Sequence, residues 1–192
     1  MAKVTNVLLV GVGGQGTILA ARILSGVLQE AGYDVKMSEV HGMSQRGGSV
    51  VTFVRYGEKV YSPLVEKGTA DIILSFEKLE ALRWLPYLKP DGTIVVNDLA
   101  LLPAPVLLGK AEYPYNALDI LREKAKELIT LDASKVAAEE VGNIRTQNVV
   151  LLGALAKHMD IEEEIWQKII RENVPPKTIE ANLKAFAAGG QY

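Results

Sequence analysis

The stretch that decides the fold of this 192-residue chain is Val4-Thr5-Asn6-Val7-Leu8-Leu9-Val10-Gly11-Val12-Gly13-Gly14-Gln15-Gly16. Its first seven residues are mostly apolar and rich in β-branched side chains, which predicts a short buried strand. The next six have the spacing Gly-x-Gly-x-x-Gly, and apolar residues then recur at three- and four-residue steps over 14–31, which predicts a helix. A further strand is predicted at 34–40. Strand, glycine loop, helix and strand together predict a Rossmann-like βαβ unit.

Strands and helices continue to alternate along the rest of the chain. Short apolar runs predict further strands, at 49–55, 70–75, 93–97 and 128–131. Periodic stretches predict further helices, at 76–85, 115–126, 134–141, 143–158, 161–173 and 177–187. A turn at 56–58 predicts a hairpin over 49–62, with a returning strand at 59–62. We therefore expect a single domain over residues 1–192, an α/β fold built as a three-layer α/β/α sandwich around a mostly parallel, mixed sheet.

Composition excludes several classes of function. The formal net charge of -2 lacks the basic excess that nucleic-acid binding needs, so no nucleic-acid partner is expected. The apolar runs are far shorter than the roughly 20 residues of a membrane span, so no membrane contact is expected and the cytoplasm is the expected compartment. The sequence has no cysteine, which excludes disulfides, a cysteine nucleophile and thiolate-held iron–sulfur clusters. The two histidines, His41 and His158, are far apart, so no metal site is expected.

The glycine loop has the chemistry of a phosphate site. Glycines allow a sharp turn and a close approach of ligand to backbone, and the following helix presents unpaired N–H groups and a partial positive charge. The candidate phosphate-binding residues are Gly11, Gly13, Gly14, Gln15 and Gly16. A tight turn that binds no ligand is the alternative.

The identity of a phosphate ligand stays open at this point. Glu39 ends the second predicted strand, where an acid would bind a ribose hydroxyl, so an NAD(P)-binding Rossmann-type oxidoreductase is one alternative. No hydride-transfer site follows downstream, however. A non-catalytic nucleotide-sensing or assembly module is a further alternative.

A second glycine-rich segment follows the second predicted strand. It is neither periodic nor apolar, and it predicts a shaped loop that faces a partner, with candidate residues His41, Met43, Gln45, Arg46, Gly47 and Gly48. The Arg46 guanidinium, next to Gly47, could bind an anion or a carboxylate. The alternative is that Arg46 forms an ion pair with Glu39 or Asp71 and stabilises the loop. Without a visible acid–base partner, His41 is interpreted as a structural or interface residue, and no catalytic residue is expected.

Residues 11–16 and Ser38–Val50 together resemble the gamma-type domain of the 2-oxoacid:ferredoxin oxidoreductases. The arrangement His41-Gly42-Met43 ahead of Arg46-Gly47-Gly48 is similar to the indolepyruvate type of that family. The resemblance continues through Asn148–Leu155, Pro175-Pro176-Lys177 and Glu180–Phe186, so it covers nearly the whole chain.

This resemblance implies a function that composition alone does not. The family decarboxylates 2-oxoacids oxidatively and transfers the acyl group to coenzyme A. It implies that thiamine diphosphate and iron–sulfur clusters lie in a large alpha subunit, with ferredoxin reached through the complex, and that this chain is a small subunit without a cofactor of its own. Coenzyme A is then the shared substrate, with its phosphates on Gly13, Gly14, Gln15 and Gly16. Self-association of the isolated chain as a homodimer is left open.

Overall fold

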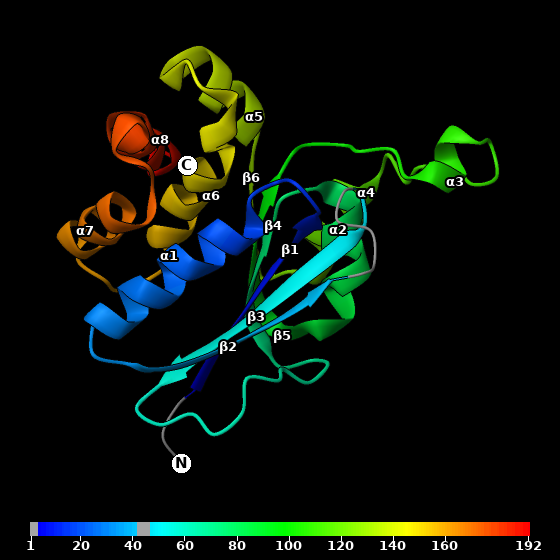
Figure 1. Cartoon of the computed structure of the whole chain (residues 1–192). Coiled ribbons are helices and arrows are strands. Elements are labelled where there is room, and N and C mark those ends of the chain that lie inside the picture. The colour runs from blue at the N-terminus through cyan, green and yellow to red at the C-terminus, as the bar shows by residue number, and fades with distance from the viewer. Residues whose placement is uncertain (1–3, 42–46) are drawn as a thin grey trace.

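A sheet forms the middle layer of the molecule (Figure 1). The computed structural model describes residues 4–41 and 47–192, and within these residues the sheet has six strands in the order β2-β3-β1-β4-β5-β6. Their bounds are β1 Val4–Val12, β2 Asp34–His41, β3 Ser49–Gly57, β4 Ala70–Ser75, β5 Leu88–Asn97 and β6 Glu127–Leu131. Strand β3 is antiparallel to both neighbours, whereas β1, β4, β5 and β6 pair in parallel. The sheet is therefore mixed and mostly parallel, as expected.

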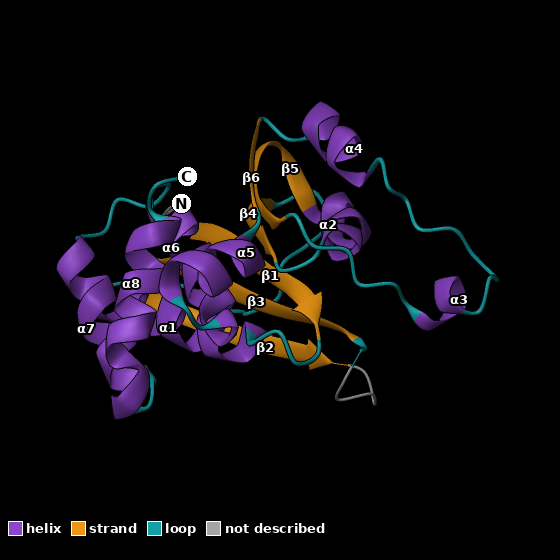
Figure 2. Ribbon diagram, turned by 90° about the horizontal axis from the view of Figure 1, so that it is seen from above, coloured by secondary structure: helices purple, strands orange, loops and turns teal. Residues whose placement is uncertain are grey.

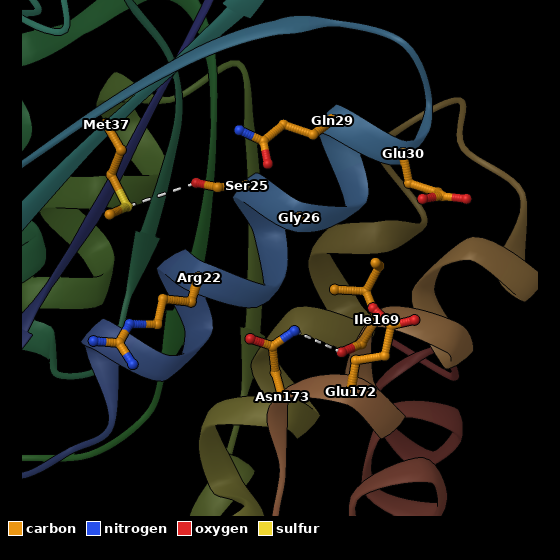
Figure 3. A pocket seen from close by; sticks show the side chains of 9 residues that line it. All are labelled: Arg22, Ser25, Gly26, Gln29, Glu30, Met37, Ile169, Glu172 and Asn173. Carbon is orange, nitrogen blue, oxygen red and sulfur yellow. Dashed lines mark hydrogen bonds between the residues drawn. The ribbon is translucent and has the colours of Figure 1, made fainter.

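Helices cover both faces of this sheet (Figure 2). One layer contains α1 Thr17–Glu30, α5 Ala133–Val136, α6 Gln147–Ala156, α7 Glu163–Asn173 and α8 Ile179–Gly189. The other contains α2 Lys78–Trp84 and α4 Ala117–Lys124. The short helix α3 Ala104–Leu107 stands apart from both layers (Figures 1 and 2). Single turns complete the chain, 3-10 at Leu85–Tyr87, Ile144–Thr146 and Pro176–Thr178, and π-helical at Ala137–Val141. The sheet and the helices on its two faces therefore form three layers, as the alternation of strands and helices in the sequence predicted.

The central strand β1 is buried on both faces. Val7 and Leu9 belong to the core beneath α1, and Leu8 and Val10 belong to the core beneath α2, all with no exposed surface. Successive side chains of a strand point to opposite faces, so an unbroken apolar run is what a sheet covered on both sides requires. Full burial of each such side chain contributes roughly 1.5–3 kcal/mol.

The predicted hairpin over 49–62 is wrong. Residues 59–62, which the structure describes, lie outside the sheet, and β3 pairs with β1 and β2 instead. The backbone N–H of Val60 donates to Asp34 Oδ2 at 3.0 Å, and the carbonyl of Ser62 accepts from Arg55 at 2.9 Å. Side-chain hydrogen bonds thus replace the ladder that a returning strand would form. Strand β3 also separates β1 from β2, so the first βαβ unit has an antiparallel strand inserted between its parallel pair.

Helices α6 and α8 pack backbone against backbone. A Cβ atom on Gly153 would lie 2.1 Å from the carbonyl oxygen of Phe186, and one on Gly189 would lie 1.9 Å from that of Val150. No side chain fits at either position, because the obstructing atoms belong to the main chain and cannot rotate away. These two glycines therefore set the distance between the two helices.

We predict that Gly153→Ala lowers the free energy of unfolding by about 3 kcal/mol, because the added methyl group forces the helices apart. Urea denaturation followed by circular dichroism measures the change. Gly190→Ala is the matched control, since its added Cβ would meet Ala187 at an ordinary 3.4 Å and its φ of -63° suits alanine. Equal stability of the two variants would contradict this packing.

Candidate functional site

The strand order creates a crevice between the carboxyl ends of β1 and β4. From β1 the chain passes through α1 on one face of the sheet, and from β4 it passes through α2 on the other face (Figure 1). The helices that follow two adjacent parallel strands therefore diverge above the sheet, which is the arrangement in which open α/β sheets bind ligands. The glycine loop that follows β1 lies at this edge, and so do Gly47 and Gly48, the described end of the second glycine-rich segment.

The glycine loop occupies the β1 side of the crevice. Gly14 has φ of +102° and Gly16 has φ of +81°, values that favour glycine. Within residues 4–41 and 47–192, a Cβ atom on Gly14 would meet nothing within 4 Å, whereas one on Gly16 would lie 2.8 Å from Asn148 Nδ2. Gly14 is thus open to an approaching ligand, and Gly16 is packed against α6. A Cβ on Gly11 would lie 2.9 Å from Gln15 Oε1, so Gly11 makes room for the next feature.

The side chain of Gln15 braces the loop from below. Its Oε1 accepts a hydrogen bond from the Val12 backbone at 2.7 Å, and its Nε2 donates to the Phe76 carbonyl at 2.9 Å. The side chain is buried and joins the end of β1 to the residue that follows β4. The Gln15 backbone N–H donates to the Val12 carbonyl at 3.2 Å, so both the amide and the backbone N–H of Gln15 hold the loop together.

Helix α1 starts directly after the loop. The first N–H groups of any helix have no partner one turn earlier, and together they carry a partial positive charge. The first turn of α1 lies wholly within the described residues and carries no acidic side chain. Asn148, in the first turn of α6, donates to the carbonyl of Gly16 at 3.3 Å. The loop is thus held so that the helix N-terminus remains available to an anion.

A cavity of about 280 Å³ lies beside the loop. Its lining comes from both glycine segments, from α2 and from the chain that follows β5: Val12, Gly13, Gly47, Glu77, Leu79, Glu80, Arg83, Leu101, Leu102 and Pro103. The two glycine segments are joined directly, because Gly13 N–H donates to the carbonyl of Gly48 at 2.9 Å. The structure therefore brings Gly13, Gly47 and Gly48 together.

Two buried carboxylates form the α2 side of this cavity. Glu77 caps α2 by accepting from Glu80 N–H at 2.9 Å, and it also accepts from Leu101 N–H at 3.1 Å and from the Tyr113 hydroxyl. Glu80 accepts from the Ser49 hydroxyl and lies 3.4 Å from Arg83 Nη1. Burial raises the pKa of the Glu80 carboxyl. The two sides of the crevice thus differ, with N–H donors on the α1 side and, on the α2 side, two buried carboxylates with the Arg83 guanidinium beside Glu80.

Sequence reasoning missed Glu77, Glu80 and Tyr113. A signal for Glu77 existed, because it lies two residues after the apolar run 70–75, and polar residues at the carboxyl ends of parallel strands face the crevice. No sequence signal indicated Tyr113, because the residue that it contacts, Glu77, is 36 positions away in the chain.

The candidate residues of the second glycine-rich segment lie only partly within the described residues. The side chain of His41 and all of Met43, Gln45 and Arg46 lie outside the described residues, so their roles stay predictions. Gly47 has φ of +77° and lines the cavity.

Glu39 does not occupy the position that a dinucleotide fingerprint requires. It pairs with Thr52 of β3, which in turn pairs with Leu9 of β1. It thus stands two strand spacings, about 10 Å, from β1, instead of on the strand next to it. The inserted strand β3 removes the geometry on which the NAD(P) alternative rested.

Comparison with known proteins places this fold and crevice in a defined class. The family model for pyruvate ferredoxin/flavodoxin oxidoreductase matches residues 6–192. The chain belongs to this family.

Individual relatives indicate which type of oxidoreductase subunit this chain is similar to. The chain is 46% identical to the indolepyruvate oxidoreductase subunit IorB of Thermococcus kodakarensis, over 97% of this chain and 95% of that protein. It is 43% identical to the subunit of the same name in Pyrococcus horikoshii, with the same coverage. A 2-oxoglutarate:ferredoxin oxidoreductase from Magnetococcus marinus, solved with 2-oxoglutarate, coenzyme A and succinyl-CoA bound, shares the fold with a TM-score of 0.77 and 22% identity. That match covers 98% of this chain and 31% of the other.

We predict that Glu80 makes the protein less stable as pH rises. Because its pKa is raised in the folded state, its contribution to stability is complete below the unfolded value of 4.5 and is lost as pH rises through the folded pKa. Glu80→Gln should therefore lose less stability than the wild type between pH 4.5 and 7 in urea titrations.

Asp34 is the control with the opposite sign, because hydrogen bonds from Lys36 and Val60 lower its pKa to about 2. Its contribution is present above 3.8 and is lost as pH falls towards 2, so Asp34→Asn should flatten only the acid side of the profile. Parallel profiles for wild type and Glu80→Gln above pH 4.5 would refute the prediction for Glu80.

Proposed function

We propose that this chain is the small subunit of an indolepyruvate (aryl 2-oxoacid):ferredoxin oxidoreductase. In that role it supports the coenzyme A-dependent oxidative decarboxylation of 2-oxoacids to acyl-CoA. The observation that carries the proposal is 46% identity to an indolepyruvate oxidoreductase subunit over 97% of this chain. The chain has no cysteine with which to bind an iron–sulfur cluster, which agrees with a complex whose large alpha subunit holds the iron–sulfur clusters and thiamine diphosphate.

The proposed coenzyme A site is the loop of Gly11, Gly13, Gly14, Gln15 and Gly16. The N–H groups at the α1 N-terminus take the phosphates, and the space above Gly14, which is open among the described residues, lets them approach the main chain. The N–H groups of Gly13 and Gln15 instead donate within the site, to the carbonyls of Gly48 and Val12. The buried carboxylate of Glu77 disfavours an anion on the other side, which supports seating the phosphates near α1. Coenzyme A supplies the thiol that accepts the acyl group, and this chain positions it.

The remaining roles belong to the assembled complex. His41, Met43, Gln45, Arg46, Gly47 and Gly48 are proposed to face the alpha subunit. Ferredoxin receives the electrons through the complex, and the chain works as one domain over residues 1–192 in the cytoplasm. In residues 4–41 and 47–192, no helix has the length and apolar character that a membrane span requires.

The chain without its partner subunit should bind coenzyme A weakly. One helix-end anion site contributes about 0.3–2 kcal/mol, whereas even a millimolar dissociation constant corresponds to about -4 kcal/mol. The alpha subunit must therefore contribute much of the binding energy.

We predict that the purified chain alone shows no turnover of aryl-pyruvate with coenzyme A and a viologen acceptor. No acid–base pair and no redox centre is assigned to it, so activity should appear only when the alpha subunit is added. Viologen reduction measured with each chain alone and with both together checks this. Turnover by the lone chain would overturn the accessory role.

We predict that Gly14→Val raises the KM for coenzyme A about tenfold in the reconstituted complex, equivalent to about 1.4 kcal/mol. A branched side chain would fill the open space through which phosphates reach the backbone. The KM for the 2-oxoacid should change little.

Gly68→Val is the matched control for backbone strain. Gly68 also has a left-handed φ, of +75°, and open space at its Cβ position, but it lies in the turn before β4. It should leave both KM values unchanged. If Gly14→Val also leaves the KM for coenzyme A unchanged in an assembled complex, the loop is only a turn. Micromolar NAD binding by the isolated chain, abolished by Glu39→Ala, would favour the dinucleotide alternative instead.

A further inference from the structure

The segment of residues 101–112, here called the arm, extends away from the body of the molecule between β5 and α4 (Figures 1 and 2). Its backbone hydrogen bonds close within the arm itself, from Leu107 N–H to the Pro103 carbonyl at 3.1 Å and from Leu108 N–H to the Ala104 carbonyl at 2.9 Å. Lys110 N–H likewise donates to the Pro105 carbonyl at 2.8 Å. The tip is thus a small folded unit around α3.

The arm presents apolar side chains to solvent. Its first eight residues run Leu101-Leu102-Pro103-Ala104-Pro105-Val106-Leu107-Leu108 without a polar side chain. Leu107 and Leu108 are each 69% exposed, and Leu101 and Leu102 are 39% and 40% exposed. Single exposed leucines are ordinary, but a contiguous projecting run of them is typical of a surface that a partner covers.

The base of the arm is fixed by one buried carboxylate. Glu77 Oε1 accepts from Leu101 N–H, where the arm begins, and from the Tyr113 hydroxyl, just beyond its end. Burial and the hydrogen bond to Glu77 both raise the pKa of Tyr113, which keeps the phenol protonated as a donor. The apolar tip is therefore held out from a clamped base.

The same base forms a wall of the crevice. Leu101, Leu102 and Pro103 line the cavity that Gly13 and Gly47 also line. A protein that covers the arm therefore also reaches the open side of the candidate coenzyme A site.

We propose that the arm is a docking element for the large alpha subunit, with Leu107 and Leu108 buried in an apolar pocket of that subunit. The inference rests on the proposed function. The partner is favoured over a second copy because the arm is continuous with the crevice that the alpha subunit must complete. In the Magnetococcus marinus enzyme this fold is likewise only 31% of a longer chain, so there it belongs to a larger polypeptide.

The test compares two double variants in binding to the purified alpha subunit. Leu107→Ser with Leu108→Ser should weaken the dissociation constant at least about tenfold, because two apolar anchors lose their burial. Tyr61→Ser with Leu64→Ser is the matched control, since these side chains are 88% and 61% exposed in the loop between β3 and β4. The control should bind as the wild type does, and both variants should keep the wild-type circular dichroism spectrum.

The outcomes separate this inference from the function on which it rests. If the wild type binds the alpha subunit and the arm variant binds equally well, the arm inference is wrong and the proposed function stands. If the wild type itself fails to bind the alpha subunit, both the arm inference and the proposed function are wrong. If the isolated chain dimerises in analytical ultracentrifugation and the arm variant abolishes only the dimer, the arm is a surface between copies and the inference is likewise overturned.

Discussion

The amide of Gln15 joins two strands that the chain order separates. By accepting from Val12 and donating to Phe76, it ties the end of β1 to the exit from β4. Those two strands pair in parallel and the crevice opens between their ends, so this buried side chain ties the glycine loop to the opposite rim. Gly11 must lack a side chain for this brace to fit, since a Cβ atom there would lie 2.9 Å from Gln15 Oε1. The first glycine of the motif thus makes room for Gln15.

The crevice built on this brace has two chemically different sides. Helix α1 offers backbone donors, whereas the start of α2 offers the buried carboxylates of Glu77 and Glu80. Such a polarised site orients a ligand as well as binding it, because an anionic group is attracted to one side and repelled from the other. The arrangement suits a long ligand whose phosphates occupy one end only, as those of coenzyme A do.

Glu77 links this crevice to the projecting arm. The carboxylate that caps α2 also holds both ends of the arm through Leu101 and Tyr113. A buried carboxylate is costly unless donors surround it, and here three donors meet the requirement. The crevice wall and the apolar tip therefore share one anchor, which explains how an element outside both helical layers keeps a defined direction.

The sequence by itself determined the layered α/β fold and the glycine loop between β1 and α1. Apolar runs, helical periodicity and the glycine spacing are local signals, and local conformation follows them. It could not decide that β3 inserts between β1 and β2, because strand order depends on long-range pairing that a run of residues does not encode. That insertion displaced Glu39 from the dinucleotide position and replaced the expected hairpin over 49–62. The contacts of Glu77 with Tyr113 and of Asn148 with Gly16 span 36 and 132 residues, and only the tertiary structure brings such pairs together.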